Sequence, residues 1–185
     1  YISDWQNTLP PSSCHEHNPE NYWLTVLSEY TEENLLFRCP SDKSNKKFID
    51  WTSPDIQQRI AQAENNLRWS SYAANNMLDM KVYGIPGNHG QYNYVLNVRN
   101  PEDCIWIFES PKHWTGQDHP HPEWWAGSIE TAKKYIDWNR HDGLSNYLFV
   151  DGHAESLPVE DTYNVKSRCL WFPQSAPRWP DWAIR

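Results

Sequence analysis

The sequence has little glycine, few positive charges and no long hydrophobic run. Seven glycines stand against 14 prolines in 185 residues, and 16 lysines and arginines stand against 24 aspartates and glutamates, a net charge of −8. An acidic chain lacks the basic surface that attracts nucleic-acid backbones and anionic membranes. No stretch approaches the roughly 18 to 20 apolar residues of a membrane-spanning helix, and no signal-peptide hydrophobic segment is present. We therefore expect a soluble chain with no nucleic-acid partner.

The motifs of common enzyme classes are also missing. The sequence has no Gly-x-Ser-x-Gly elbow, no His-Glu-x-x-His helix and no glycine-rich phosphate loop. It has no Cys-x-x-Cys pair that would indicate a zinc knuckle or a redox site. The sequence therefore does not predict an enzyme.

The cysteines are few and widely spaced, at Cys14, Cys39, Cys104 and Cys169. In an oxidising compartment they would form two disulfides, in any of three pairings. Free buried thiols are the alternative, and both remain open.

Large aromatic side chains are abundant. Only 38% of residues are hydrophobic, but 12 tryptophans and 10 tyrosines raise the aromatic fraction to 15%. A core can therefore form from few, large side chains. The length fits one domain, and the 14 prolines predict long irregular segments between short elements.

Two segments predict helices. Residues 18–30 begin with Asn18 as N-cap and Pro19 at the first helical position, and residues 53–67 begin with Ser53 before a proline. Apolar residues recur at helical spacing in both segments: Trp23, Leu24, Leu27 and Tyr30, and Ile56, Ile60 and Leu67.

Strand patterns follow later in the chain. Residues 93–98 and 104–110 are rich in β-branched and aromatic residues, and the second run has the composition of a strand buried on both faces. Residues 110–128 contain three prolines and predict a long excursion, whereas residues 129–141 are helical at first and alternate from Tyr135 onward.

Residues 146–157 predict a β-hairpin. Two strand-like arms flank Asp151 and Gly152, a dipeptide typical of a two-residue type I′ turn, in which both residues have positive φ. The last segment, 158–185, predicts an extended arm fixed by aromatic contacts. The aromatic residues concerned are Trp171, Phe172, Trp179 and Trp182. Helices followed by antiparallel strands indicate an α+β domain.

A spacing pattern around this hairpin resembles a known family. Nine residues separate His141 from Asp151-Gly152, and Asn146 and His153 stand at the positions expected between and after them. The pattern resembles the motif of the prepilin-type H-X9-DG family, whose members are similar to major pseudopilins of type II secretion systems and to type IV pilins.

Four further blocks resemble the same family in the same order. They are YISDWQNTLPPSS at 1–13, FRCPSD at 37–42, SYAANNML at 71–78, and RNPEDCIWIFES at 99–110, a strand that closes with an acidic residue. The resemblance covers 1–157, the expected head, and leaves 158–185 as a Pro/Trp-rich extension of the same domain.

The resemblance implies a pilin-like head, in which the remnant of an N-terminal helix packs on an antiparallel sheet with a C-terminal hairpin. It implies a structural subunit of a type II secretion pseudopilus or related surface filament, located in the cell envelope at the periplasmic or extracellular face of the cytoplasmic membrane, or in a surface filament. Its partners would be other pilin-like subunits and the secretion machinery. Membrane contact would come only through a hydrophobic N-terminal helix, which is missing from this sequence.

Two sets of residues are candidate metal sites. Asp142, Asn146 and Asp151 offer the oxygen donors that calcium prefers, with Glu155 and Asp161 nearby in sequence, although the same residues suit an ordinary hairpin turn. In the 110–128 excursion, His119, His121 and Glu123 have the donors of a zinc or nickel site and, as a third hypothesis, of a metal-dependent hydrolase.

Tryptophans of the same excursion suggest a contact surface. If exposed, Trp114, Trp124 and Trp125 would stack on sugar rings or pack against a neighbouring subunit. A surface glycan-binding module on a pilin-like scaffold is therefore the alternative function, and burial in the core is the alternative for any single tryptophan.

Overall fold

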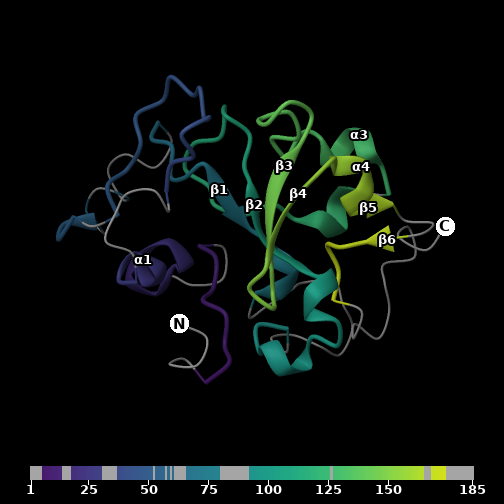
Figure 1. Cartoon of the computed structure of the whole chain (residues 1–185). Coiled ribbons are helices and arrows are strands. Elements are labelled where there is room, and N and C mark those ends of the chain that lie inside the picture. Colours follow the sequence, from purple (N-terminus) through teal and green to yellow (C-terminus); the bar gives the residue numbers. More distant parts are fainter. Residues whose placement is uncertain are drawn as a thin grey trace.

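The computed structural model shows an α+β fold with a four-stranded antiparallel sheet and short helices (Figure 1). It describes residues 6–13, 18–30, 37–51, 53–56, 58, 60, 66–79, 92–125, 127–164 and 168–173. The strands are β1 (Tyr72–Ala74), β2 (Ile105–Glu109), β3 (Ser145–Phe149), β4 (Ala154–Leu157), β5 (Tyr163–Asn164) and β6 (Arg168–Cys169). The helices are α1 (Trp23–Ser28), α3 (Ile129–Ala132) and α4 (Val159–Thr162), with 3₁₀ turns at Pro19–Asn21, Asn76–Leu78, Val95–Asn97, Pro101–Asp103 and Pro122–Trp125.

The sheet has the order β1-β2-β3-β4, and every neighbouring pair is antiparallel. All five residues of β2 are buried, which confirms the prediction of a strand covered on both faces. The register slips between Ile105, which pairs with Phe149, and Ile107, which pairs with Leu148. An irregularity of this kind bends the strand and increases its local twist.

The buried hydrophobic side chains form two separate clusters. Figure 1 shows α1 on one side of the sheet and α3 and α4 on the other. The aromatic cluster, on the α3 and α4 side, centres on Trp171, whose ring lies 4.8 Å from those of Phe108 and Trp125. Both ring pairs are close to perpendicular, the edge-to-face arrangement that the aromatic quadrupole favours.

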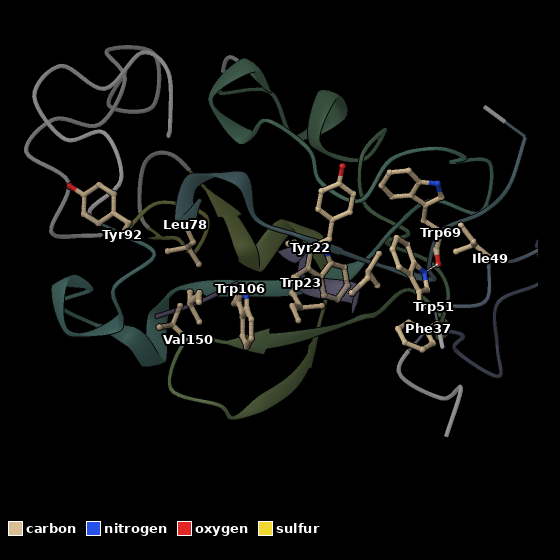
Figure 2. Close-up of a cluster of buried hydrophobic side chains, with 14 of the residues drawn as sticks. Tyr22, Trp23, Phe37, Ile49, Trp51, Trp69, Leu78, Tyr92, Trp106 and Val150 are labelled. Carbon is tan, nitrogen blue, oxygen red and sulfur yellow. Dashed lines mark hydrogen bonds between the residues drawn. The ribbon is translucent and has the colours of Figure 1, made fainter. Parts of the chain in front are cut away.

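The N-terminal cluster, on the α1 side, joins residues from distant parts of the chain (Figure 2). Trp51 donates its indole N–H to the carbonyl oxygen of Trp69 at 2.8 Å, and the two rings are edge to face at 5.6 Å. Trp23, from α1, is fully buried in the same cluster. The prediction that few, large aromatic residues build the core is confirmed.

The first predicted helix is present in two parts. Asn18 accepts a hydrogen bond from the Glu20 N–H at 3.2 Å, so it caps a 3₁₀ turn that starts at Pro19. Tyr22 is extended, and α1 follows it. In the second predicted helix, Ile56 and Ile60 are helical and buried as expected, while much of that segment lies outside the described residues.

The strand predicted at 93–98 is wrong. Residues Val95–Asn97 form a 3₁₀ turn, and Tyr94 makes only an isolated bridge to Thr8. Leu96 is 68% exposed. The β-branched composition is misleading because the described structure gives this segment no partner strand to complete a ladder.

The hairpin is confirmed, but its predicted two-residue turn is wrong. Phe149 donates its N–H to the His153 carbonyl oxygen, so the loop comprises residues 150–152. Only Gly152 has positive φ, at 95°, and its N–H bonds to the Phe149 carbonyl oxygen. This is typical of a three-residue hairpin loop. Val150 does not pair with β4, because its N–H donates to the carbonyl oxygen of Cys104, the residue before β2.

The segment after the hairpin is not the extended arm predicted for 158–185. It forms α4 and the two-stranded ladder of β5 and β6, and then Trp171 and Phe172 enter the aromatic cluster. The predicted aromatic anchoring is confirmed for these two residues. Trp179 and Trp182 lie outside the described residues.

The expected remnant of an N-terminal helix is not seen. Gln6 and Asn7 have positive φ of 54° and 63°, and Thr8 bridges to Tyr94. A right-handed helix requires negative φ, so residues 6 and 7 form a turn and not a helix; residues 1–5 lie outside the described part. Within the described ranges, no helix has the length and apolar character needed to cross a bilayer.

Candidate functional site

Several blocks of the family resemblance meet at one place, beside the ends of β1 and β2. Block 37–42 lies in a turn, and block 71–78 contains β1. Block 99–110 contains β2, and His141 lies in the turn before β3. We call their shared core the buried polar cluster. It consists of Cys39, Asp42, Arg68, Ser71, Glu109, Arg140 and His141.

Asp42 is the acceptor at one end of the buried polar cluster. Its Oδ2 accepts hydrogen bonds from Ser71 Oγ and from Arg68 Nη2, both at 2.7 Å, and Arg140 Nη2 lies 3.4 Å away. Burial alone would raise the pKa of Asp42. The hydrogen bonds from Ser71 and the Ser44 N–H, together with the two guanidinium charges, outweigh burial and lower this pKa. Asp42 is therefore a charged structural anchor.

Glu109, at the end of β2, is the acceptor at the other end and is fully buried. Its Oε2 accepts the Asn146 N–H at 2.9 Å, and its Oε1 lies 2.9 Å from His141 Nε2 and 3.4 Å from Arg140 Nη1. Burial would lower the pKa of Arg140, but the charges of Glu109, Asp137 and Asp42 outweigh it and raise that pKa.

Cys39 adds a sulfur atom to this arrangement. Its Sγ lies 3.7 Å from His141 Nε2, and the ligand atoms of Cys39, Glu109 and His141 all lie within 4.8 Å of one another. Among the described residues, no other group of three His, Cys, Asp or Glu side chains converges in this way. A nucleophile, base and acid relay would use both imidazole nitrogens. Here the Cys39 sulfur and the Glu109 carboxylate both lie beside the same nitrogen, His141 Nε2. The three ligand atoms therefore surround one point and do not form a relay.

The described cysteines Cys39, Cys104 and Cys169 are free thiols. Cys14 lies outside the described residues. Burial raises the pKa of Cys104 and Cys169, the latter to about 12, so these two thiols stay protonated at neutral pH.

A largely apolar pocket of about 280 Å³ adjoins the buried polar cluster. It is lined by Trp23, Tyr72, Ile107, Asn146, Tyr147, Leu148 and Ala154. Tyr72 connects the two features: burial raises its pKa to about 12, and the neighbouring Cys39 and Glu109 add to the effect. The phenol is therefore neutral and next to the thiol.

The predicted calcium ligands are not brought together. Asp142 is exposed in the turn before β3, with φ of 53°, and the Asn146 side chain accepts a hydrogen bond from Ser156 Oγ. Asp151 lies beyond the other end of β3, and five strand residues span roughly 16 Å. Asp151 instead accepts the His153 N–H at 3.1 Å and contacts His153 Nδ1 at 2.7 Å. Asp151 therefore lies in a turn, and the structure does not place Asp142, Asn146 and Asp151 around one point.

The histidines of the 110–128 excursion lie close together but contact different acids. His119 Nδ1 lies 2.8 Å from Asp118, and His121 Nδ1 lies 2.9 Å from Glu123. Asp118 is fully buried and also accepts the Trp23 indole N–H at 2.9 Å. His119, His121 and Glu123 do not form a converging ligand set.

The three tryptophans of the excursion do not form one platform. Trp114 is 5% exposed and Trp125 is fully buried, whereas Trp124 is 68% exposed and stacks on His121 at 3.9 Å. The first two fill the aromatic cluster. Of the predicted sugar-binding surface, only Trp124 is accessible.

Comparison with known proteins gives no relative: no family model, curated protein or solved structure matches this chain. The fold alone therefore sets the class of the molecule, an α+β domain with a four-stranded antiparallel sheet.

Sequence reasoning missed Cys39 and Glu109 as site residues. They lie 70 positions apart in the chain, so no local spacing pattern links them. The available signal was their place at conspicuous positions of the resembling blocks, in Cys-Pro-Ser-Asp and at the acidic end of a strand.

Proposed function

We propose that this chain is the head of a prepilin-like structural subunit, belonging to a type II secretion pseudopilus or a related cell-surface filament. The observation that carries the proposal is the buried polar cluster. Blocks 37–42, 71–78, 99–110 and 141–152 resemble the family in sequence alone, and residues from all four lie within one contact network.

Chance resemblances have no reason to coincide in space. Blocks that belong to one inherited scaffold do, because buried polar residues must satisfy one another. The network ties the turn at 37–42, the end of β2 and the start of β3, so its effect is to hold the head in shape. A subunit that acts by assembly needs such a rigid head.

The hairpin supports the same proposal. In the resembling family the motif ends at Asp-Gly, and here Asp151 and Gly152 close the β3–β4 hairpin. His141 lies at the opposite end and contacts Glu109. The nine intervening residues are the turn at 142–144, the five residues of β3 and Val150, the first residue of the hairpin loop, so the spacing measures the distance from one end of β3 to the other.

The test uses the intact protein in cells that produce it. We expect Tyr1 to follow a hydrophobic helix whose short basic leader is cleaved, and the protein to appear in sheared surface filaments by immunogold microscopy. Its contacts with pilin-like subunits would appear as cross-links within those filaments. Recovery only as a species without a processed hydrophobic helix, and absent from filaments, would overturn the proposal.

A further inference from the structure

Three side chains of the buried polar cluster present metal-ligand atoms to one point. Cys39 comes from the 37–42 turn, Glu109 from the end of β2, and His141 from the turn before β3. Cys39 is 3% exposed and Glu109 is fully buried, while the His141 side chain is 29% exposed. The point is thus enclosed on two sides and reached from solvent past the imidazole.

Two of the three ligand-atom separations can be compared with those around a tetrahedral ion. With zinc–sulfur and zinc–nitrogen bonds of about 2.3 and 2.0 Å, tetrahedral ligands have sulfur and nitrogen about 3.5 Å apart, and nitrogen and oxygen about 3.3 Å apart. Cys39 Sγ and His141 Nε2 are 3.7 Å apart, and His141 Nε2 and Glu109 Oε1 are 2.9 Å apart. Opening the second contact by a few tenths of an ångström admits the ion.

The donor set selects the class of metal. A thiolate and an imidazole favour zinc and its neighbours in the first transition series over calcium and magnesium, which take oxygen ligands. Three protein ligands also leave a coordination position for water. We propose that Cys39, Glu109 and His141 together bind one divalent transition-metal ion of the zinc class.

The charges balance when the ion binds. Without metal, the contact between His141 Nε2 and an ionised Glu109 requires a proton on Nε2. On binding, that proton moves to Nδ1, and the Cys39 thiol releases its proton to solvent. A dication then faces one thiolate and one carboxylate, so the centre is neutral.

Arg140 does not prevent this exchange, although its Nη1 lies 3.4 Å from Glu109 Oε1. Its guanidinium also bonds to Asp137 Oδ2 at 3.0 Å, to the Ser110 carbonyl oxygen at 2.6 Å and to the Ser71 carbonyl oxygen at 2.9 Å. These partners hold it when Glu109 turns to the ion. Glu109 is oriented through its other oxygen by the Asn146 N–H, an outer-sphere support of the kind metal ligands usually have.

The experiment titrates tag-free intact protein with Zn²⁺ and then with Co²⁺. We expect one equivalent of metal per chain by elemental analysis, and an intense near-ultraviolet band from thiolate-to-cobalt charge transfer. Cys39→Ser and His141→Gln should both lose stoichiometric binding, and Cys39→Ser should lose the band. His153→Gln, in the same hairpin, and His121→Gln, at the rival histidine pair, should bind as the unaltered protein does.

A second measurement needs no substitution and so does not depend on the variants folding. Zn²⁺ should slow alkylation of Cys39 by iodoacetamide at least about tenfold, since a coordinated thiolate is withdrawn from reaction. The rate is read by mass spectrometry of the Cys39 peptide. No stoichiometric metal in the unaltered protein, alkylation that zinc leaves unchanged, or binding abolished by His121→Gln instead would overturn the proposal.

Discussion

The two ends of the β3–β4 hairpin carry the two halves of one sequence motif, yet their surroundings are opposite. At the His141 end, the imidazole lies against buried Glu109 and the sulfur of Cys39. At the other end, Asp151 and His153 are exposed and bond mainly to each other. The two halves of the motif therefore have different roles in the folded protein.

The difference shows which half of the motif depends on chemistry and which on backbone geometry. The His141 end places buried charges in contact, where each loses its hydration and needs its partners. The Asp151 end needs only a residue that closes a turn and a glycine that accepts positive φ. Substitutions at the two ends should therefore differ in size and in kind.

The largest effect is expected from Glu109→Ala. The change leaves Arg140, His141 and the Asn146 N–H without their shared acceptor in a buried site. Breaking a buried pair in this way costs about 3–5 kcal/mol of unfolding free energy. Urea unfolding followed by tryptophan fluorescence measures this free energy. If Glu109→Ala loses no more stability than Asp151→Ala, the two ends of the hairpin do not differ as described.

The next effect is a pH dependence that belongs to the buried polar cluster. Because the pKa of Asp42 is lower in the folded than in the unfolded protein, its stabilisation is present above the usual aspartate pKa of about 3.9 and is lost as pH falls through the folded value. Asp42→Asn should be less stable than the unaltered protein near pH 7, and the gap should narrow by about pH 2.5.

The control for this pH dependence is Asp151→Asn. Slight burial would raise the pKa of Asp151, but its hydrogen bonds from His153 lower it, at an exposed site. The gap between Asp151→Asn and the unaltered protein should be small at both pH values. Urea midpoints supply both comparisons, and a gap for Asp42→Asn that stays constant with pH would refute the assignment.

A matched pair of glycines isolates the backbone contribution. Gly143 and Gly152 stand at opposite ends of the hairpin, with φ of 91° and 95° and nothing within 4 Å of an added Cβ. Alanine at either position should cost about 1–2 kcal/mol through backbone strain alone. Chemical denaturation should give similar losses of unfolding free energy for the two variants. A much larger loss for one of them would show that its glycine has a role beyond accepting positive φ.

The smallest effect is expected from Asp151→Ala. The substitution removes the acceptor of the His153 N–H in an exposed turn and leaves the β3–β4 ladder intact. A loss of about 0.5–1 kcal/mol is the usual net value of one such hydrogen bond. Thermal unfolding measures it, and a loss above about 2 kcal/mol would show that the turn has a partner beyond the hairpin.

The sequence predicts those helices and strands that are determined by residues close together in the chain. The capping by Asn18, the buried run of β2 and the hairpin all follow from residues close in sequence. Strand β1 (Tyr72–Ala74) has no comparable pattern, because pairing with β2 makes it a strand. The 93–98 segment has the pattern but no partner among the described residues, so it forms a 3₁₀ turn.

The candidate site is predictable only in part, for a similar reason. His141 is marked by its spacing from the Asp-Gly turn, but Cys39 and Glu109 reach it only through the folded sheet. Sequence proximity instead suggests the His119 and His121 pair, where each imidazole contacts a separate acid. Metal-ligand geometry depends on tertiary contacts, which composition and spacing do not encode.

The exposure of β4 has a consequence for crowding. The strand is at the margin of the sheet, and within the described ranges only β3 pairs with it. The unpaired backbone groups of an edge strand can form hydrogen bonds with the edge strand of another molecule. Here the strand is four residues long, carries exposed Glu155 and is followed directly by Pro158. A charge, a short length and a nearby proline are features that discourage edge-to-edge pairing between sheets, so this edge is not expected to join the sheets of two molecules.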